Sequence, residues 1–369
     1  MAPIRILVVD DSVVVRKVLS DTLAEDRALE VVGAAGDGRL ALAKIALLKP
    51  DLITLDIEMP VMNGLETLVV IRQLYPRLPV IMFSVLTERG AAAALDALAL
   101  GASDYATKPS NTSPAVAIES IRLELIPKIK ALCGIAPQEV PRMPRPRPAS
   151  KVRDRATWRI EVVAIGASTG GPSALGEVLP RIPYDFPVPI VVVQHMPPIF
   201  TRQLAERLSA RSAIRVEEGS AGAVLSPGYA WIAPGDFHMQ VTRRGADRSL
   251  HLDQGPKENS CRPAVDVLFR SVALAYGANV LGVVMTGMGT DGVLGAQEIC
   301  AAGGDVIIQD QASAVIWGMP GAVHTLGISD GAYPLDHMAA EIARRVRRGR
   351  SPGVPLDAVS CGSLESRAK

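Results

Sequence analysis

Residues 4–12 read IRILVVDDS, a short apolar run that ends at two aspartates. Such a run predicts a buried strand of a parallel sheet. The pattern then alternates: residues 13–23 predict a helix, 29–34 a strand, 38–48 a helix, and 51–55 and 80–83 two further strands. Strands and helices that alternate at this spacing predict an α/β fold with a doubly wound parallel sheet.

Polar residues follow the predicted strands at their carboxyl ends, where open α/β sheets place their sites. These residues are Asp10, Asp11, Asp56, Ser84 and Lys108. Three converging carboxylates favour a hard divalent cation, most simply Mg²⁺. An aspartate beside Mg²⁺, a lysine and a hydroxyl is equipped to accept a phosphoryl group. An isolated Asp11 would be read as a helix cap, but the five residues together indicate a phosphoryl site.

The amino-acid composition changes after a predicted helix over residues 114–133. Residues 135–159 are rich in proline and arginine and predict a semi-extended linker. A second strand–helix series begins at residue 161, with the strand-like runs EVVAIG, PIVVVQH, NVLGVVMTG and DVIIQD. We therefore predict an α/β domain at 1–134, a linker at 135–159, a second doubly wound α/β domain at 160–350 and a disordered tail at 351–369. Met338, Ile342 and Val346 predict a final amphipathic helix.

The stretch Gly166-Ala-Ser168-Thr-Gly170 lies between a predicted strand and a predicted helix. This is the G-x-S-x-G arrangement, in which a tight turn lifts a serine hydroxyl above the edge of a sheet. Taken alone, the glycine-rich stretch fits a phosphate-binding turn equally well.

A nucleophilic serine needs a base and a residue that orients the base. Of the five histidines, only His195 directly follows a buried-type strand, and Asp291 follows another. Ser168, His195 and Asp291 are therefore a candidate triad. We assign the other four histidines to loops or helices: His238, His251, His324 and His337.

Two rival functions compete with the triad. Residues 287–292 form a literal G-x-G-x-x-G after a strand, and Asp310 ends the next strand, which is close to a dinucleotide fingerprint. Against it, Asp291 would place a carboxylate in the phosphate turn. A DNA-binding output is the second rival, but no short basic helix-turn-helix follows the linker.

Composition limits the classes of partner and compartment. Hydrophobic residues make up 48%, charged residues 21%, and the formal net charge is +1, so global charge predicts no nucleic-acid partner. The four cysteines form no CxxC pair, which favours reduced thiols in the cytoplasm. Neither a signal peptide nor a membrane span is predicted, so a membrane-attached substrate would be met from the water side.

The motifs VVDDS, LDIEMPVMNGLE and Lys108-Pro109 resemble those of a response-regulator receiver domain over roughly residues 3–125. The resemblance implies that Asp56 accepts the phosphoryl group from a histidine kinase of the chemotaxis type. It also implies roles for further residues, namely Mg²⁺ ligands (Asp10, Asp11, Asp56 and the backbone carbonyl of Glu58), phosphoryl-binding groups (Ser84 and Lys108) and a switch aromatic (Tyr105).

Five motifs of the second half resemble the catalytic domain of the CheB-type chemotaxis receptor methylesterases: GASTGGPSAL, VVVQHMP, SCRPAVDVLFRSVA, MTGMGTDG and QDQASAVIWGMPGAV. The resemblance implies a serine hydrolase that demethylates glutamate methyl esters of membrane chemoreceptors, with receptor glutaminase activity and no cofactor in this domain. It assigns Ser168 as nucleophile, His195 as base and Asp291 as the residue that orients His195. Oxyanion stabilisation near Thr169 and Met288 is also implied.

The sequence departs from that family at one place, since Cys261 stands where a histidine is expected. We expect this difference to affect substrate docking at the surface and not the triad. A receiver joined to an esterase further implies that the receiver inhibits the enzyme and that phosphorylation of Asp56 relieves the inhibition.

Overall fold

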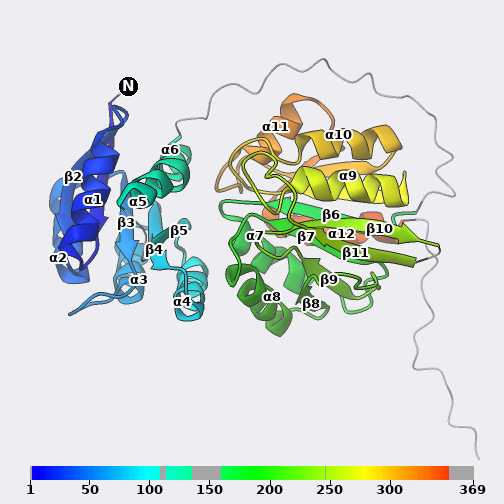
Figure 1. The fold of residues 1–369 in the computed structure, drawn as a ribbon, viewed down its shortest axis with the longest axis horizontal. Coiled ribbons are helices and arrows are strands. Elements are labelled where there is room, and N and C mark those ends of the chain that lie inside the picture. The colour runs from blue at the N-terminus through cyan, green and yellow to red at the C-terminus, as the bar shows by residue number, and fades with distance from the viewer. Residues whose placement is uncertain (1, 109–113, 135–158, 246, 349–369) are drawn as a thin grey trace, which may run out of the picture.

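The computed structural model describes residues 2–108, 114–134, 159–245 and 247–348, which fold around two parallel sheets (Figure 1). The predicted linker, except Arg159, and the predicted disordered tail lie outside the described residues.

The N-terminal half contains a five-stranded parallel sheet in the order β2-β1-β3-β4-β5. Its strands are β1 (Ile4–Val9), β2 (Leu29–Ala35), β3 (Leu52–Asp56), β4 (Val80–Val85) and β5 (Asp104–Lys108). Its helices are α1 (Val13–Ala24), α2 (Gly38–Leu48), α3 (Gly64–Leu74), α4 (Glu88–Ala99), α5 (Pro114–Ser120) and α6 (Ile126–Leu132), the last two joined by the π-helical turn η1 (Ile121–Leu125). The predicted doubly wound sheet is confirmed.

The C-terminal half contains a seven-stranded sheet in the order β14-β13-β12-β6-β7-β9-β8, and its paired strands are parallel. Its strands are β6 (Val162–Ala167), β7 (Ile190–Gln194), β8 (Arg215–Glu218), β9 (Tyr229–Ile232), β12 (Val280–Val284), β13 (Asp305–Gln309) and β14 (Ala332–Tyr333). Its helices are α7 (Gly171–Val178), α8 (Phe200–Arg211), α9 (Val265–Tyr276), α10 (Val293–Ala302), α11 (Met319–Thr325) and α12 (Leu335–Arg347), with the 3₁₀ turn η2 (Leu179–Arg181) after α7.

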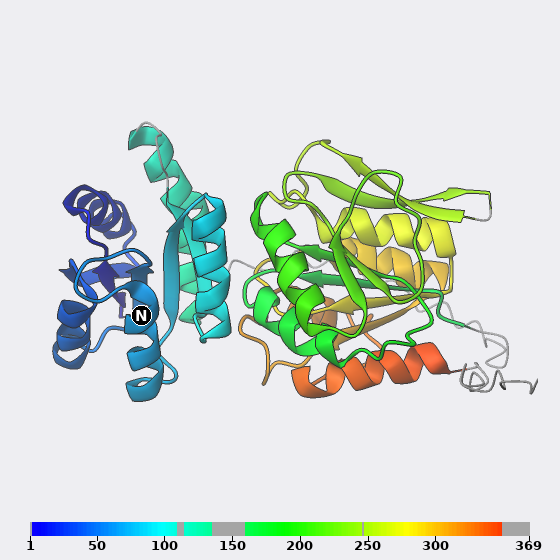
Figure 2. The same ribbon diagram turned by 90° about the horizontal axis from the view of Figure 1, so that it is seen from below.

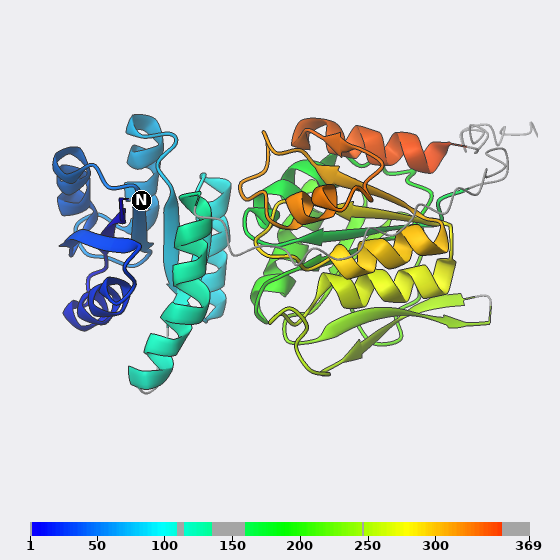
Figure 3. The same cartoon turned by 90° about the horizontal axis from the view of Figure 1, so that it is seen from above.

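Helices cover both faces of the second sheet (Figures 2 and 3). Residues of α7, α8 and α12 pack in one hydrophobic cluster, and residues of α9, α10 and α11 pack in another on the opposite face. Met338, Ile342 and Val346 of α12 are fully buried, which confirms the predicted amphipathic helix. The second sheet is therefore doubly wound as well.

An antiparallel hairpin of β10 (His238–Arg244) and β11 (Asp247–Asp253) lies outside both sheets. The assignment of His238 and His251 to loops or helices is therefore wrong. The segment alternates, with Met239, Val241 and Leu250 buried, and this period of two is typical of strands with one covered face. The hairpin leads into α9 through residues 254–264, the segment that reaches the candidate active site.

Candidate active site and phosphorylation site

Ser168 lies on the turn that joins β6 to α7. Its backbone N–H donates to Thr286 O (3.0 Å), and its carbonyl accepts from Gly171 N (2.7 Å), so the turn is fixed on both sides. Gly170 has a φ of +77°, a left-handed conformation that favours glycine. Gly287 lies against the serine, because a Cβ added there would come within 2.9 Å of Ser168 Cβ. The two glycines therefore allow the turn to present its hydroxyl at the carboxyl edge of the sheet.

His195 directly follows β7, beside Ser168. Ala167 pairs with Gln194 in the parallel register, so Ser168 and His195 are the next residues along two neighbouring strands. The buried Gln194 side chain donates from Nε2 to the carbonyls of Ser168 (2.9 Å) and His195 (3.3 Å). This bridging role was not predicted from the sequence, although a polar residue at the end of an apolar strand is a signal for it.

Asp291 completes the group, as predicted by its place after β12. The His195 Nε2 atom lies 2.7 Å from Asp291 Oδ2, and the two side chains are 12% and 2% exposed. Burial lowers the pKa of His195, but its hydrogen bonds, first of all the one to Asp291, outweigh burial and hold that pKa above its ordinary value. Burial raises the pKa of Asp291, but the hydrogen bond and charge of His195, together with backbone hydrogen bonds from Val265 and Asp266, outweigh burial, so the net shift is downward.

The pair commits one ring nitrogen of His195, Nε2, and leaves Nδ1 outside the contact with Asp291. With Nε2–H directed at Asp291, Nδ1 is the nitrogen that can take a proton from a serine. Among the described residues, no hydrogen bond joins Ser168 Oγ to His195, and apo sites of this kind often close only around substrate. The structure thus brings the three predicted residues to one sheet edge with the imidazole already oriented.

Cys261 also reaches this nitrogen. Its Sγ lies 3.5 Å from His195 Nδ1, and the side chain is half-buried. The structure therefore places Cys261 against the triad, whereas the sequence analysis assigned its effect to surface docking alone. The reason is the loop between β11 and α9, whose path over the sheet edge leaves no periodic signal in the sequence.

Two backbone N–H groups fit the implied oxyanion role. Thr169 follows the nucleophile, and Met288 follows Gly287, which packs on Ser168. Within the part of the chain that the structure describes, neither N–H donates to a protein acceptor. Donors that are held by the backbone and left without an acceptor can stabilise developing negative charge.

The two carboxylates on which the dinucleotide hypothesis depends are hydrogen-bonded to other groups of the protein. Asp291, in the glycine-rich turn, is occupied by His195. The Asp310 carboxylate accepts from the backbone N–H (3.0 Å) and the hydroxyl (2.6 Å) of Ser313, so it is held by the turn that follows it. Neither carboxylate is placed to bind a ribose.

The candidate phosphorylation site lies at the carboxyl edge of the first sheet. Asp10, Asp11 and Asp56 each offer an oxygen within 4.8 Å of the others. Lys108 Nζ lies 2.7 Å from Asp10 Oδ2 and 2.7 Å from Asp56 Oδ1. Burial raises the pKa of Asp56 to about 6, and the hydrogen bond from Lys108 opposes that rise. An all-oxygen donor set of this kind fits Mg²⁺.

Two other predicted residues flank Asp56. The buried Ser84 hydroxyl donates to Gly90 O (3.0 Å) and is thus held within the same strand-end region. The Glu58 side chain points to solvent and lies 3.3 Å from Arg89. The role implied for the Glu58 carbonyl stays a prediction.

The two halves of the chain meet through α4, which packs against α7 and α8 (Figures 1 and 2). Tyr105, at 4% exposure, stacks on Phe200 of α8 with ring centroids 4.6 Å apart and an interplanar angle of 13°. Phe200 lies five residues after His195, and α7 begins three residues after Ser168. The contact surface is therefore formed by residues that closely follow Ser168 and His195 along the chain.

Polar contacts surround this aromatic stack. Arg207 of α8 donates to Asp96 Oδ1 (2.7 Å) and Ala92 O (2.7 Å) of α4. Gln203 donates to Glu88 O (2.7 Å), and Arg202 pairs with the Glu88 carboxylate (2.5 Å). A cavity of about 490 Å³ remains between the helices, lined by apolar side chains of α4 and α8 together with Glu177 and Arg211. The interface is thus partly polar and incompletely packed.

Comparison with known proteins gives concordant relatives for both halves. The family model for the CheB methylesterase matches residues 163–342, and that for the response regulator receiver domain matches residues 6–118. A protein-glutamate methylesterase/protein-glutamine glutaminase of Trichodesmium erythraeum is 53% identical over 351 residues, which are 94% of this chain and all of the relative.

Two further relatives agree with these matches. The protein of the same description from a Nocardioides species is 50% identical over 98% of this chain and its own full length. The crystal structure of the Thermotoga maritima CheB methylesterase catalytic domain is 40% identical, covers 50% of this chain and 98% of that domain, and superposes with a TM-score of 0.50.

Proposed function

This chain belongs to the CheB methylesterase family, and from that premise we propose which of its residues carry out and control the reaction. It is a protein-glutamate methylesterase/protein-glutamine glutaminase with a response-regulator receiver domain, and it acts in chemotactic adaptation. We assign residues 1–134 to the receiver and residues 160–350 to the catalytic domain.

Ser168 is the nucleophile of the proposed reaction. His195 Nδ1 takes the hydroxyl proton as Ser168 Oγ bonds to the ester carbonyl carbon, and Asp291 stabilises the imidazolium that results. The N–H groups of Thr169 and Met288 stabilise the oxyanion. The observation that carries this proposal is the 2.7 Å contact between His195 and Asp291 beside a serine on a fixed turn.

Collapse of the tetrahedral intermediate breaks the ester bond. The methoxy oxygen leaves with the proton held by His195, which gives methanol and an acyl-serine. Water then attacks the acyl carbon as His195 takes its proton, and the bond to Ser168 Oγ breaks. His195 returns that proton to Ser168 Oγ, which regenerates the enzyme and leaves a glutamate carboxylate. With a glutamine substrate the same steps release ammonia and give the same glutamate.

Replacement of Ser168 by alanine tests the assignment. We expect Ser168→Ala to lower methanol release from methylated chemoreceptor membranes on the order of 10⁴- to 10⁶-fold, because the acyl-enzyme can no longer form. Thermal unfolding should be unchanged within about 2 °C, since Ser168 is held by its backbone. Near-normal turnover by the folded variant would remove Ser168 from the mechanism.

The receiver is proposed to take a phosphoryl group on Asp56 from a histidine kinase of the chemotaxis type. Asp10, Asp11 and Asp56, with the Glu58 carbonyl, would hold Mg²⁺, which when bound offsets charge on the phosphoryl oxygens. Lys108 and Ser84 would bind those oxygens. No cofactor is assigned to the catalytic domain, and no nucleic acid enters the scheme.

Phosphorylation is proposed to relieve inhibition that the receiver exerts through α4. The stacked pair Tyr105–Phe200 supports this proposal, because the residue expected to switch on phosphorylation lies in the contact with the catalytic domain.

The partners are methyl-accepting chemoreceptors, and the compartment is the cytoplasm, where thiols such as those of Cys133 and Cys300 stay reduced. None of the described helices is long and apolar enough to cross a bilayer.

A further inference from the structure

Asp291 depends on its neighbours to face His195. Its Oδ2 accepts from Val265 N (2.6 Å) in addition to His195, and its Oδ1 accepts from Asp266 N (3.0 Å) and Gly292 N (2.9 Å). Val265 and Asp266 are the first two residues of α9, so the catalytic carboxylate caps a helix to which it does not belong. The orientation of Asp291 is therefore tied to the start of α9.

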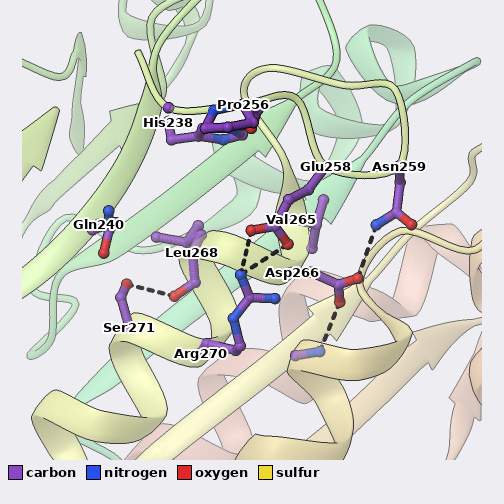
Figure 4. Close-up of polar contacts among 12 residues, drawn as sticks. His238, Gln240, Pro256, Glu258, Asn259, Val265, Asp266, Leu268, Arg270 and Ser271 are labelled. Carbon is purple, nitrogen blue, oxygen red and sulfur yellow. Dashed lines mark hydrogen bonds and ion pairs between the residues drawn. The ribbon is translucent and has the colours of Figure 1, made fainter. Parts of the chain in front are cut away.

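Asp266 makes the reciprocal contact. Its Oδ1 accepts from Gly295 N (2.7 Å) in the first turn of α10, the helix that begins just after Asp291. Neither helix has a side-chain cap of its own, because Ala264 and Gly292 stand at the two capping positions. Each carboxylate thus caps the other's helix, and Figure 4 shows Asp266 between a backbone N–H and the side chain of Asn259.

Asn259 joins the two carboxylates. Its Nδ2 lies 2.9 Å from Asp266 Oδ2 and 2.9 Å from Asp291 Oδ1. Asp266 and Asp291 are 1% and 2% exposed, so two buried negative groups share one neutral donor that is itself exposed. An amide NH₂ has two hydrogens, which allows it to serve both oxygens at once.

The turn that carries Asn259 is strained. Asn259 and Ser260 have φ of +50° and +63°, a conformation that costs non-glycine residues about 1 kcal/mol or more each. Glu258 and Cys261 close the turn through reciprocal backbone hydrogen bonds (3.1 and 2.8 Å). Arg270 of α9 pairs with the Glu258 carboxylate (2.6 Å), which Figure 4 shows on the side of the turn away from Asn259. Strain of this kind persists where the surrounding contacts enforce it.

We propose that Asn259 and Asp266 are positioning residues of the esterase, which hold Asp291 against His195 through the shared amide and the exchanged helix caps. This inference rests on the proposed function. Asp266 also contributes charge to the site. It is faced by Asp291, by Arg270 and, beyond Asp291, by His195, while Glu258 neutralises part of the Arg270 charge. Burial and the charge of Asp291 raise the pKa of Asp266 to about 6.

Four variants of the full-length chain test the proposal by methanol release from methylated receptor membranes across pH 5.5–9. Asn259→Ala should lower kcat roughly 10- to 100-fold with KM unchanged, because misplacement of a catalytic group by about 1 Å costs on that order. Asn259→Asp keeps the shape and loses the donor, so its loss at pH 8 should be at least as large.

Asp266→Asn should lower kcat and move the acid limb of kcat/KM to lower pH by roughly half a unit or more. Removal of a negative charge makes the imidazolium of His195 less favourable. Glu298→Gln is the matched control: it removes a carboxylate charge from the exposed face of α10, and among the described residues no hydrogen bond or ion pair holds that side chain. It should stay within about twofold of the parent chain with an unshifted profile.

Thermal unfolding separates positioning from folding. A lowered midpoint with unchanged kcat and pH profile in Asn259→Ala and Asp266→Asn would overturn the proposal and leave these residues a purely structural role. Equal losses in Glu298→Gln and Asn259→Ala would also overturn it. The proposed function fails by a different result, namely turnover by Ser168→Ala, so the two inferences can be told apart.

Discussion

At the scale of single residues, the chemistry turns on which nitrogen of His195 is free. Nε2 faces Asp291, so Nδ1 is the nitrogen proposed to act as the base, and Cys261 Sγ lies 3.5 Å from that atom. A thiol is a weak hydrogen-bond donor and yields the nitrogen readily to a serine hydroxyl. The cysteine is therefore compatible with the triad, although a histidine was expected at its position.

The raised pKa of His195 leads to a pH prediction. Only the neutral imidazole can accept the Ser168 proton, so the acid limb of kcat/KM should have its midpoint above 6.5, the ordinary value for histidine. In Asp291→Asn the hydrogen bond and charge that raise the pKa are lost. The limb should move to lower pH while the plateau falls on the order of 10⁴-fold. A pH–rate profile of both proteins checks this, and a limb that stays in place in the variant would contradict it.

At the scale of elements, the strand ends were predictable and the loops were not. Apolar runs that stop at Asp10, Ser168 and His195 reveal the carboxyl edges of parallel strands, because such strands are buried on both faces. Nothing periodic marks Asn259 or Asp266, whose roles depend on two helix starts that meet only in the folded chain. The hairpin that holds His238 was missed for a related reason, since alternation over seven residues is a weak signal beside longer apolar runs.

Gly287, which follows β12, lies close to both α11 and the turn that carries Ser168. A Cβ at this position would lie 2.3 Å from Met319 Sδ and 2.9 Å from Ser168 Cβ. We expect Gly287→Ala to displace the Ser168 turn and to lower kcat for methanol release at least tenfold, with a lower unfolding midpoint. Gly176→Ala is the control, because its nearest neighbour would be Arg211 Nη1 at 3.8 Å within a regular helix. It should be neutral or slightly stabilising. Full activity in Gly287→Ala would contradict this prediction, because it would mean that the Ser168 turn accommodates the added methyl group.

At the scale of the whole molecule, two α/β units lie side by side (Figure 3), and we propose that one restrains the other. The sequence motifs predicted both units and both sites, but not the surface between them, because contacts such as Tyr105 on Phe200 join residues with no sequence relation. Exposed ion pairs across this surface are individually weak, in the range of about 0–1 kcal/mol. An interface held this lightly can be shifted by a coupling of ~1–3 kcal/mol, which corresponds to roughly 5- to 150-fold activation.

A charge exchange between α4 and α8 tests whether this surface restrains the enzyme. Asp96 lies 2.7 Å from Arg207, with side chains 54% and 33% exposed. Asp96→Arg opposes two cations there and should raise methanol release by the unphosphorylated chain roughly two- to fivefold, as a loss of about 1 kcal/mol of restraint would. Adding Arg207→Asp restores an attractive pair and should bring activity back toward the parental level.

Asp56→Ala should keep low activity and should not be activated by a small phosphodonor with Mg²⁺. Residues 155–369 alone should be more active than the unphosphorylated chain. If Asp96→Arg and the isolated catalytic piece both matched the parent, the contact seen between α4 and α8 would not be the inhibitory one.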